Sequence, residues 1–227
     1  MKKVLVMAAA LSLLAAPALA SSVVNSKHNL SSAGPGSAKT SNYNEVCIFC
    51  HTPHGASLKV TGSPLWNRTV TGDNQDATTM YNSSTLETSS RPSNGSNVSG
   101  VNNSDAPLCF SSHDGASLNS TLVNPANSLG NAQPNFSSTN MGSGLILDGA
   151  NALKNDHPIG ISYRDAQATD AQLVNYTTLT GAVKVSYGVD GERVWCSSCH
   201  DVHDDANYPF LVMSNSASNL CRACHIK

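Results

Sequence analysis

Three short stretches carry the same pattern of two cysteines separated by two residues and followed directly by histidine. Two cysteines at this spacing can form thioethers with the two vinyl groups of one porphyrin. The histidine then lies beneath the ring, where its imidazole can bind iron. The pattern predicts covalently attached haem c at each stretch. The expected attachment residues are Cys47 and Cys50, Cys196 and Cys199, and Cys221 and Cys224, with His51, His200 and His225 as proximal iron ligands.

Other uses of paired cysteines fit the sequence less well. A single pair can serve redox exchange or form half of a zinc site, and an exported protein can use cysteines for disulfides. Zinc sites would combine two pairs and leave the third unused, and the chain has seven cysteines, an odd number. Neither alternative requires a histidine after every pair, so haem attachment is the preferred interpretation.

A fourth stretch, Cys109-Phe110-Ser111-Ser112-His113, has serine where the second cysteine would stand. Because a hydroxyl cannot form the thioether, attachment here would run through Cys109 alone, with His113 as the proximal ligand. The alternative is a decayed site and a protein with three haems.

The histidine count favours the fourth haem. The chain has eight histidines, of which four follow the motifs. Four haems with two axial histidines each would use all eight, which predicts bis-histidine ligation throughout. The expected distal ligands are His28, His54, His157 and His203.

Two distal histidines stand three residues after a proximal one, His54 after His51 and His203 after His200. Residues three apart lie on the same side of a helical turn, whereas two ligands of one iron must approach from opposite faces of the ring. We therefore expect His54 and His203 each to serve a neighbouring haem.

The rest of the chain predicts little regular structure. Residues 1–20 combine Lys2 and Lys3, an apolar run and a small-residue end, as in a cleaved secretory signal. Residues 21–227 would form one domain that contains a polar loop over 69–106. Short helices are expected around the motifs, and the apolar alternation over 183–195 predicts one small β-hairpin. With only 5% aromatic residues, haem would have to supply much of the core.

Charge and hydropathy limit the classes of partner and the cellular locations that we expect. The formal net charge of −2 falls to −4 once Lys2 and Lys3 are removed, so no basic surface for nucleic acid is expected. No later stretch is apolar enough to span a membrane. These features predict an exported protein, at the cell surface or in the periplasm.

The segments CIFCHTPHGA, PLW, LCFSSHDGA, NDHPI, CSSCHDVHD and NLCRACH occur in an order that resembles the small exported multihaem c-type cytochromes of metal-reducing bacteria, in particular tetrahaem outer-surface cytochromes that polymerise. The resemblance implies a mostly irregular multihaem cytochrome c fold and electron transfer through four stacked haems to other redox proteins or extracellular acceptors. It also implies a homopolymer in which one subunit donates an axial histidine to the next, and His28 is the expected donor. A monomeric periplasmic shuttle and a multihaem reductase with an open iron position are the alternatives.

Overall fold

The computed structural model describes residues 21–59, 63, 65–70, 81, 83–85, 104–115, 118, 121–138, 141, 152–179, 183–185 and 193–226. The expected signal segment and most of the polar loop over 69–106 lie outside these residues. Among the described residues, no helix is both long enough and apolar enough to cross a membrane.

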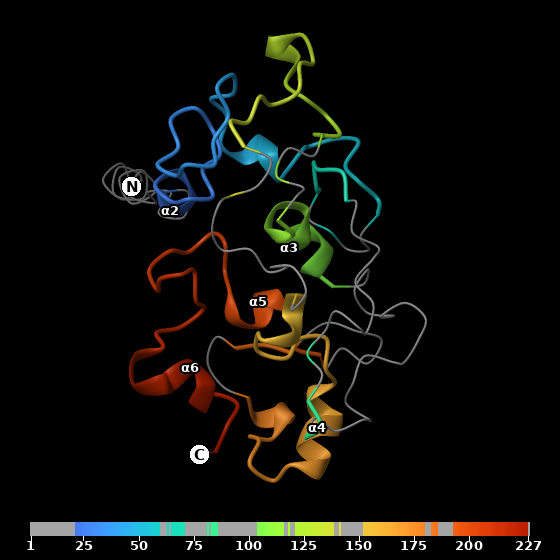
Figure 1. Cartoon of the computed structure of the whole chain (residues 1–227), viewed down its shortest axis with the longest axis vertical. Coiled ribbons are helices and arrows are strands. Elements are labelled where there is room, and N and C mark those ends of the chain that lie inside the picture. Colours follow the sequence, from blue (N-terminus) through green and yellow to red (C-terminus); the bar gives the residue numbers. More distant parts are fainter. Residues whose placement is uncertain are drawn as a thin grey trace, which may run out of the picture.

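The helices of the described residues are short (Figure 1). The α-helices are α2 (Ser21–Val24), α3 (Ala106–His113), α4 (Tyr163–Thr169), α5 (Cys196–Cys199) and α6 (Asn219–Arg222). Single 3₁₀ turns cover Cys47–Phe49, Asn127–Leu129, Ala152–Lys154, Tyr176–Thr178 and Ser216–Ser218. All four cysteine motifs thus coincide with a helix or a 3₁₀ turn.

Local chemistry explains where the two longest helices of the described residues begin. Pro107 stands in the first turn of α3, where the missing N–H has no partner to lose. At the start of α4, the Ser162 hydroxyl accepts a hydrogen bond from the Asp165 N–H, which caps the helix. In the described residues β-structure is confined to six isolated antiparallel bridges.

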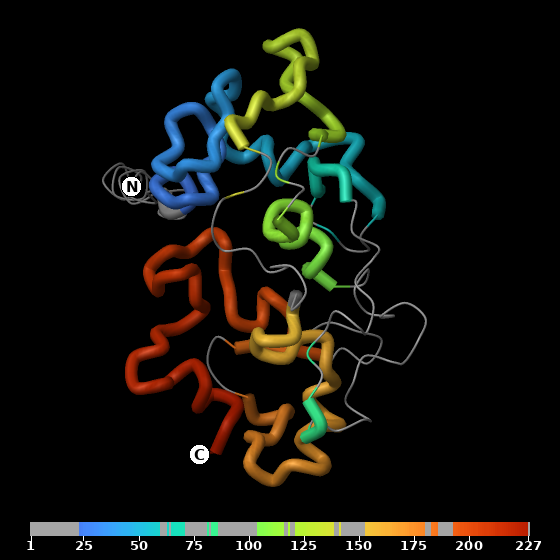
Figure 2. Tube along the Cα trace, viewed as in Figure 1, coloured from blue at the N-terminus to red at the C-terminus, as the bar shows by residue number. Residues whose placement is uncertain are grey.

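The molecule is elongated, with the N-terminal segments at one end and the C-terminal segments at the other (Figure 2). Residues 21–59 and 121–138 wrap one end, residues 152–179 and 193–226 form the other, and α3 lies between them with α5 beside it (Figure 1). The ring centroids of His28 and Phe210 are 4.4 Å apart, so the first and last segments touch.

Two small apolar clusters hold these ends. The larger consists of Leu30, Tyr43, Phe49, Leu118, Leu122 and Ala126. The smaller consists of Ala106, Phe110, Leu153 and Trp195. Each cluster is modest for a chain of 227 residues, because the free energy gained by apolar burial must offset the entropy of ordering the backbone.

The expected hairpin over 183–195 is not seen in the described residues. Its turn, residues 188–191, lies outside them, and residues 183–185 form no strand. Val194 instead pairs with the segment before α4. Its N–H donates to Ile161 at 3.2 Å, and its carbonyl accepts from Gly160 at 2.8 Å.

Candidate functional site: the cysteine–histidine motifs and their ring pairs

The three complete motifs share one local conformation. In each, the histidine N–H donates to the carbonyl of the first cysteine, with N···O distances of 2.9 Å at His51, 3.0 Å at His200 and 2.9 Å at His225. This i→i−4 bond closes a single helical turn. Residues at i and i+4 lie on one side of such a turn, so the first cysteine and the histidine point to a common side.

A backbone clamp also repeats at these motifs, although the sequence has no matching repeat. In each clamp, a tripeptide from another segment makes two backbone hydrogen bonds to the motif. The N–H of the residue after the histidine donates to the carbonyl of the first residue of the tripeptide. The N–H of the third residue of the tripeptide donates to the carbonyl of the second cysteine. The N···O distances are 2.9 and 3.0 Å at the first motif, 2.8 and 2.9 Å at the second, and 2.7 and 2.8 Å at the third. The partner tripeptides are residues 65–67, 210–212 and 172–174.

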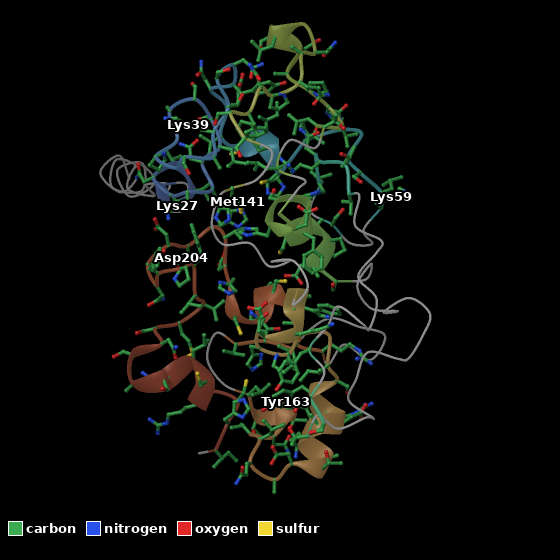
Figure 3. The ribbon with its side chains drawn as sticks, in the orientation of Figure 1. Lys27, Lys39, Lys59, Met141, Tyr163 and Asp204 are labelled. Atoms are coloured by element: carbon green, nitrogen blue, oxygen red, sulfur yellow. The ribbon has the colours of Figure 1, made fainter. Side chains whose placement is uncertain are left out.

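Each clamp fixes the backbone on both sides of a proximal histidine, so the direction in which its ring leaves the chain is set locally. At the third motif, the Tyr163 hydroxyl reinforces the clamp by donating to the carbonyls of Val174 at 2.9 Å and Cys224 at 3.1 Å. Tyr163 lies in the end of the molecule formed by the later segments (Figure 3). Burial is the main cause that raises the pKa of this hydroxyl, so it remains a donor.

The incomplete motif is built differently. Cys109 and His113 lie within α3, and the helix ends when the Asp114 N–H donates to Phe110 at 3.2 Å. Among the described residues, no β-bridge forms at His113. Cys109 and His113 keep the i, i+4 relation on the helix, so the single cysteine and its histidine still share a side.

Three pairs of histidine rings lie close together. The ring centroids are 6.0 Å apart for His51 and His203, 6.2 Å for His28 and His113, and 6.4 Å for His157 and His225. Every pair joins one histidine of a motif to one histidine outside the motifs. His203 therefore lies against the first motif and not against His200, its neighbour in sequence.

This spacing fits two axial ligands of one iron. Two imidazoles bound through one nitrogen each, at metal–nitrogen distances of about 2 Å on opposite sides of an ion, have centroids roughly 6 Å apart. The Nδ1 atom of His28 is also buried with no hydrogen-bond partner, an arrangement that is costly unless the nitrogen has another use. The donor set therefore fits a bis-histidine haem iron.

The two remaining histidines, His54 and His200, make no ring contact of this kind with another histidine of the described residues. His54 is exposed, and its own backbone carbonyl accepts a hydrogen bond of 3.0 Å from the Thr52 hydroxyl. His200 is exposed too, and its Nδ1 lies 3.1 Å from the carbonyl oxygen of Pro209. An N–H at Nδ1 would donate to this oxygen, leaving Nε2 as the nitrogen able to bind iron.

Burial favours the neutral, ligating form of the most enclosed histidine. The pKa of His28 falls to about 4, chiefly because desolvation opposes its charged form and also because His113, His203 and His200 lie nearby. The imidazole is therefore neutral at neutral pH, as iron binding requires.

No disulfide joins any two of the seven cysteines. Burial raises the pKa of Cys50 and of Cys199 to about 11 each. In the described residues the one group of three metal-ligating side chains comprises Asp105, Cys109 and Cys196, whose ligand atoms lie within 4.8 Å of one another. This group does not combine two Cys-x-x-Cys pairs, as the zinc alternative would require.

The sequence patterns did not single out Trp66 or Trp195 as functional residues. Both are buried, at 9% and 1% exposure, and both indole N–H groups lack a hydrogen-bond partner. Trp66 also stands edge-on to His51, with ring centroids 6.3 Å apart. A buried indole donor needs an acceptor, and the carboxylates of a haem are of the right kind.

One comparison with known proteins bears on the second and third complete motifs. Residues 189–227 match the family model described as a doubled CXXCH motif. No curated protein matches the chain. The match covers the two motifs at the C-terminal end, and it supports covalently bound haem c and a multihaem c-type cytochrome as the class of protein.

Proposed function

We propose that this protein transfers electrons through four bis-histidine haems c. Cys47 and Cys50, Cys196 and Cys199, and Cys221 and Cys224 hold three of them by two thioethers each, and Cys109 alone holds the fourth. The observation that carries the proposal is the pairing of motif with non-motif histidines in all three ring contacts, at 6.0–6.4 Å. Ordinary packing of histidines would have no reason to respect this division.

The residues of the chain would hold and tune the cofactor. Bound haem supplies a one-electron couple, whose potential depends on axial ligands and burial. The backbone clamps fix the histidines of the three complete motifs. The indole N–H groups of Trp66 and Trp195 offer donors to carboxylates. Rigid ligation on both sides keeps the geometry unchanged between the two oxidation states.

Three of the sites have a second histidine within the chain, which leaves no open iron position for a small substrate at those sites. This favours an electron carrier over a reductase. The remaining proximal histidine, His200, would take its second ligand from His54, the histidine left over when the three pairs are formed.

We further propose that the protein is exported and that it forms an extracellular filament, with the monomeric periplasmic shuttle as the second candidate. The expected donated ligand was His28, but its ring centroid lies 6.2 Å from that of His113 in the same chain. His54 is the better candidate, because it is exposed and lacks a ring partner in the described residues. A His54 donated by the adjacent subunit would complete the His200 site.

The haem content is tested by the denatured intact mass of the mature protein together with its visible spectrum. Four haem masses above the apo chain, with low-spin ferric bands, are expected. A colourless protein would refute the proposal, and three covalent haems would refute attachment through Cys109.

The filament is tested by negative-stain imaging of the wild type and of His54→Ala. Filaments are expected from the wild type only, whereas His54→Ala should give haem-loaded monomers whose His200 site turns high-spin. Wild-type protein that stays monomeric and low-spin at every concentration would support the shuttle instead.

A further inference from the structure

The three ring pairs differ in how their planes are turned, and this difference has a measurable consequence. The planes of His51 and His203 are 17° apart, whereas those of His28 and His113 are 63° apart and those of His157 and His225 are 72° apart. Building on the haem c function proposed above, we infer that His51–His203, His28–His113 and His157–His225 are the three in-chain axial pairs and that the first has a distinct electronic structure.

The argument for the pairing begins with where the rings come from. His51 and His203 belong to segments near opposite ends of the chain, yet their centroids are 6.0 Å apart. At this spacing, one iron between the two rings could bind a nitrogen atom of each.

Contacts within the protein restrict the planes of several of these rings. The His157 Nδ1 lies 2.9 Å from the Pro158 carbonyl oxygen, and the His28 ring packs against Phe210 with planes 56° apart. The His51 ring stands at 90° to Trp66. At the partner of His51, the His203 N–H donates to the Asp201 carboxylate at 2.9 Å. These contacts restrict how the rings of His28, His51 and His157 can turn.

The angle between two axial imidazoles controls the low-spin ferric iron they share. Each imidazole donates π-electron density into the iron d orbital perpendicular to its own plane. Near-parallel rings raise the energy of only one of the two iron d orbitals that can accept this density, which yields a rhombic electron paramagnetic resonance spectrum. Near-perpendicular rings raise both almost equally, which yields a strongly anisotropic spectrum with one dominant low-field feature.

The oxidised holoprotein is therefore expected to show a rhombic low-spin species from His51–His203 and at least two haem equivalents of the strongly anisotropic kind. The deciding variant is His203→Ala, which should lose one equivalent of the rhombic species while the intact mass still shows every covalent haem. The matched variant His28→Ala should lose one equivalent of the anisotropic species and keep the rhombic one.

His203→Met provides a second readout in a six-coordinate protein. A methionine ligand should add a sulfur-to-iron charge-transfer absorption and raise the potential of one haem. The pairing is wrong if His203→Ala keeps the full rhombic signal or loses the anisotropic one while haem content is normal. A protein without covalent haem would refute the proposed function itself, so the two failures are distinguishable.

Discussion

The backbone N–H of Ser197 donates a hydrogen bond of 2.6 Å to the Asp105 carboxylate, linking the start of α5 to the start of α3. These residues are 92 positions apart in the chain. The bond brings the helix that carries Cys109 against the helix that carries Cys196. It therefore joins the incomplete motif to the second complete motif, and no sequence pattern predicts this contact.

Asp105 makes this contact between α3 and α5 sensitive to pH. Burial is the main cause that raises the Asp105 pKa above 3.8, and the hydrogen bond from Ser197 opposes the shift in part. The folded state thus holds this proton more tightly than the unfolded state. Stability from this group is present below pH 3.8 and declines as the pH rises through the folded pKa.

Asp105→Asn keeps an acceptor for Ser197 and removes the charge. We expect the variant to match the wild type most closely in acid and to gain relative stability towards neutral pH. Thermal unfolding of the holoprotein across that range measures this difference. Asp204→Asn, at an exposed turn where the side chain accepts from Ala206, is the control. A difference between wild type and Asp105→Asn that is constant with pH would contradict the prediction.

Arg68 is buried at 1% exposure, and its guanidinium donates to one carbonyl of α3 and to one carbonyl that follows this helix. Its Nη2 donates to Ser111 at 3.1 Å and to Leu118 at 2.6 Å. Arg68→Ala should cost about 3 kcal/mol of unfolding free energy, because both buried carbonyls lose a charged donor. Chemical denaturation of the wild type and the variant measures this loss of unfolding free energy. The control Arg164→Ala removes an exposed ion pair with Asp165 and should cost at most about 1 kcal/mol; equal losses in the two variants would contradict the expectation.

Gly34 and Gly36 form a matched pair in the segment that carries His28. A Cβ at Gly34 would lie 1.9 Å from the Asn29 carbonyl oxygen, whereas the nearest atom to a Cβ at Gly36 is 3.7 Å away. Gly34→Ala should therefore cost about 1–3 kcal/mol, and Gly36→Ala should change stability by less than about 1 kcal/mol. The two thermal midpoints test this, and an unchanged midpoint in Gly34→Ala would refute it.

The single thioether proposed for the incomplete motif gives a spectral prediction. With serine at 112, one vinyl group would stay conjugated, so alkaline pyridine should show one haem with a red-shifted α-band. Ser112→Cys should remove that component. The intact mass should rise only by the difference between sulfur and oxygen, because a thiol adds across a vinyl group with no leaving group. Ser112→Ala should keep the wild-type spectrum. A Ser112→Cys spectrum identical to the wild type would mean that the second thioether does not form.

Haem removal should unfold the chain. Among the described residues, the two apolar clusters contain six and four buried side chains, too few to offset the entropy of ordering the backbone without the cofactor. Protein made without haem attachment should show no cooperative thermal transition by circular dichroism. A cooperative transition near that of the holoprotein would show that the polypeptide supplies its own core.

The sequence alone determined the chemistry of each motif. Cys-x-x-Cys-His is a local pattern, and the turn that closes it joins residues four apart, so residue types at positions such as 47, 50 and 51 suffice to indicate haem attachment. The family match over residues 189–227 supports this part. The count of eight histidines indicated how many ligands exist, without showing which rings meet.

The tertiary structure decided the rest. Whether His203 meets His51 depends on contacts between the two ends of the chain, and no local pattern encodes these. The clamps over residues 65–67, 172–174 and 210–212 use backbone groups, which every residue type offers, so they leave no signature in the sequence. The same reason explains why the apolar alternation before Val194 suggested a hairpin, although Val194 pairs with Ile161. Alternation indicates which face is buried, whereas the partner is chosen by the packing of distant segments.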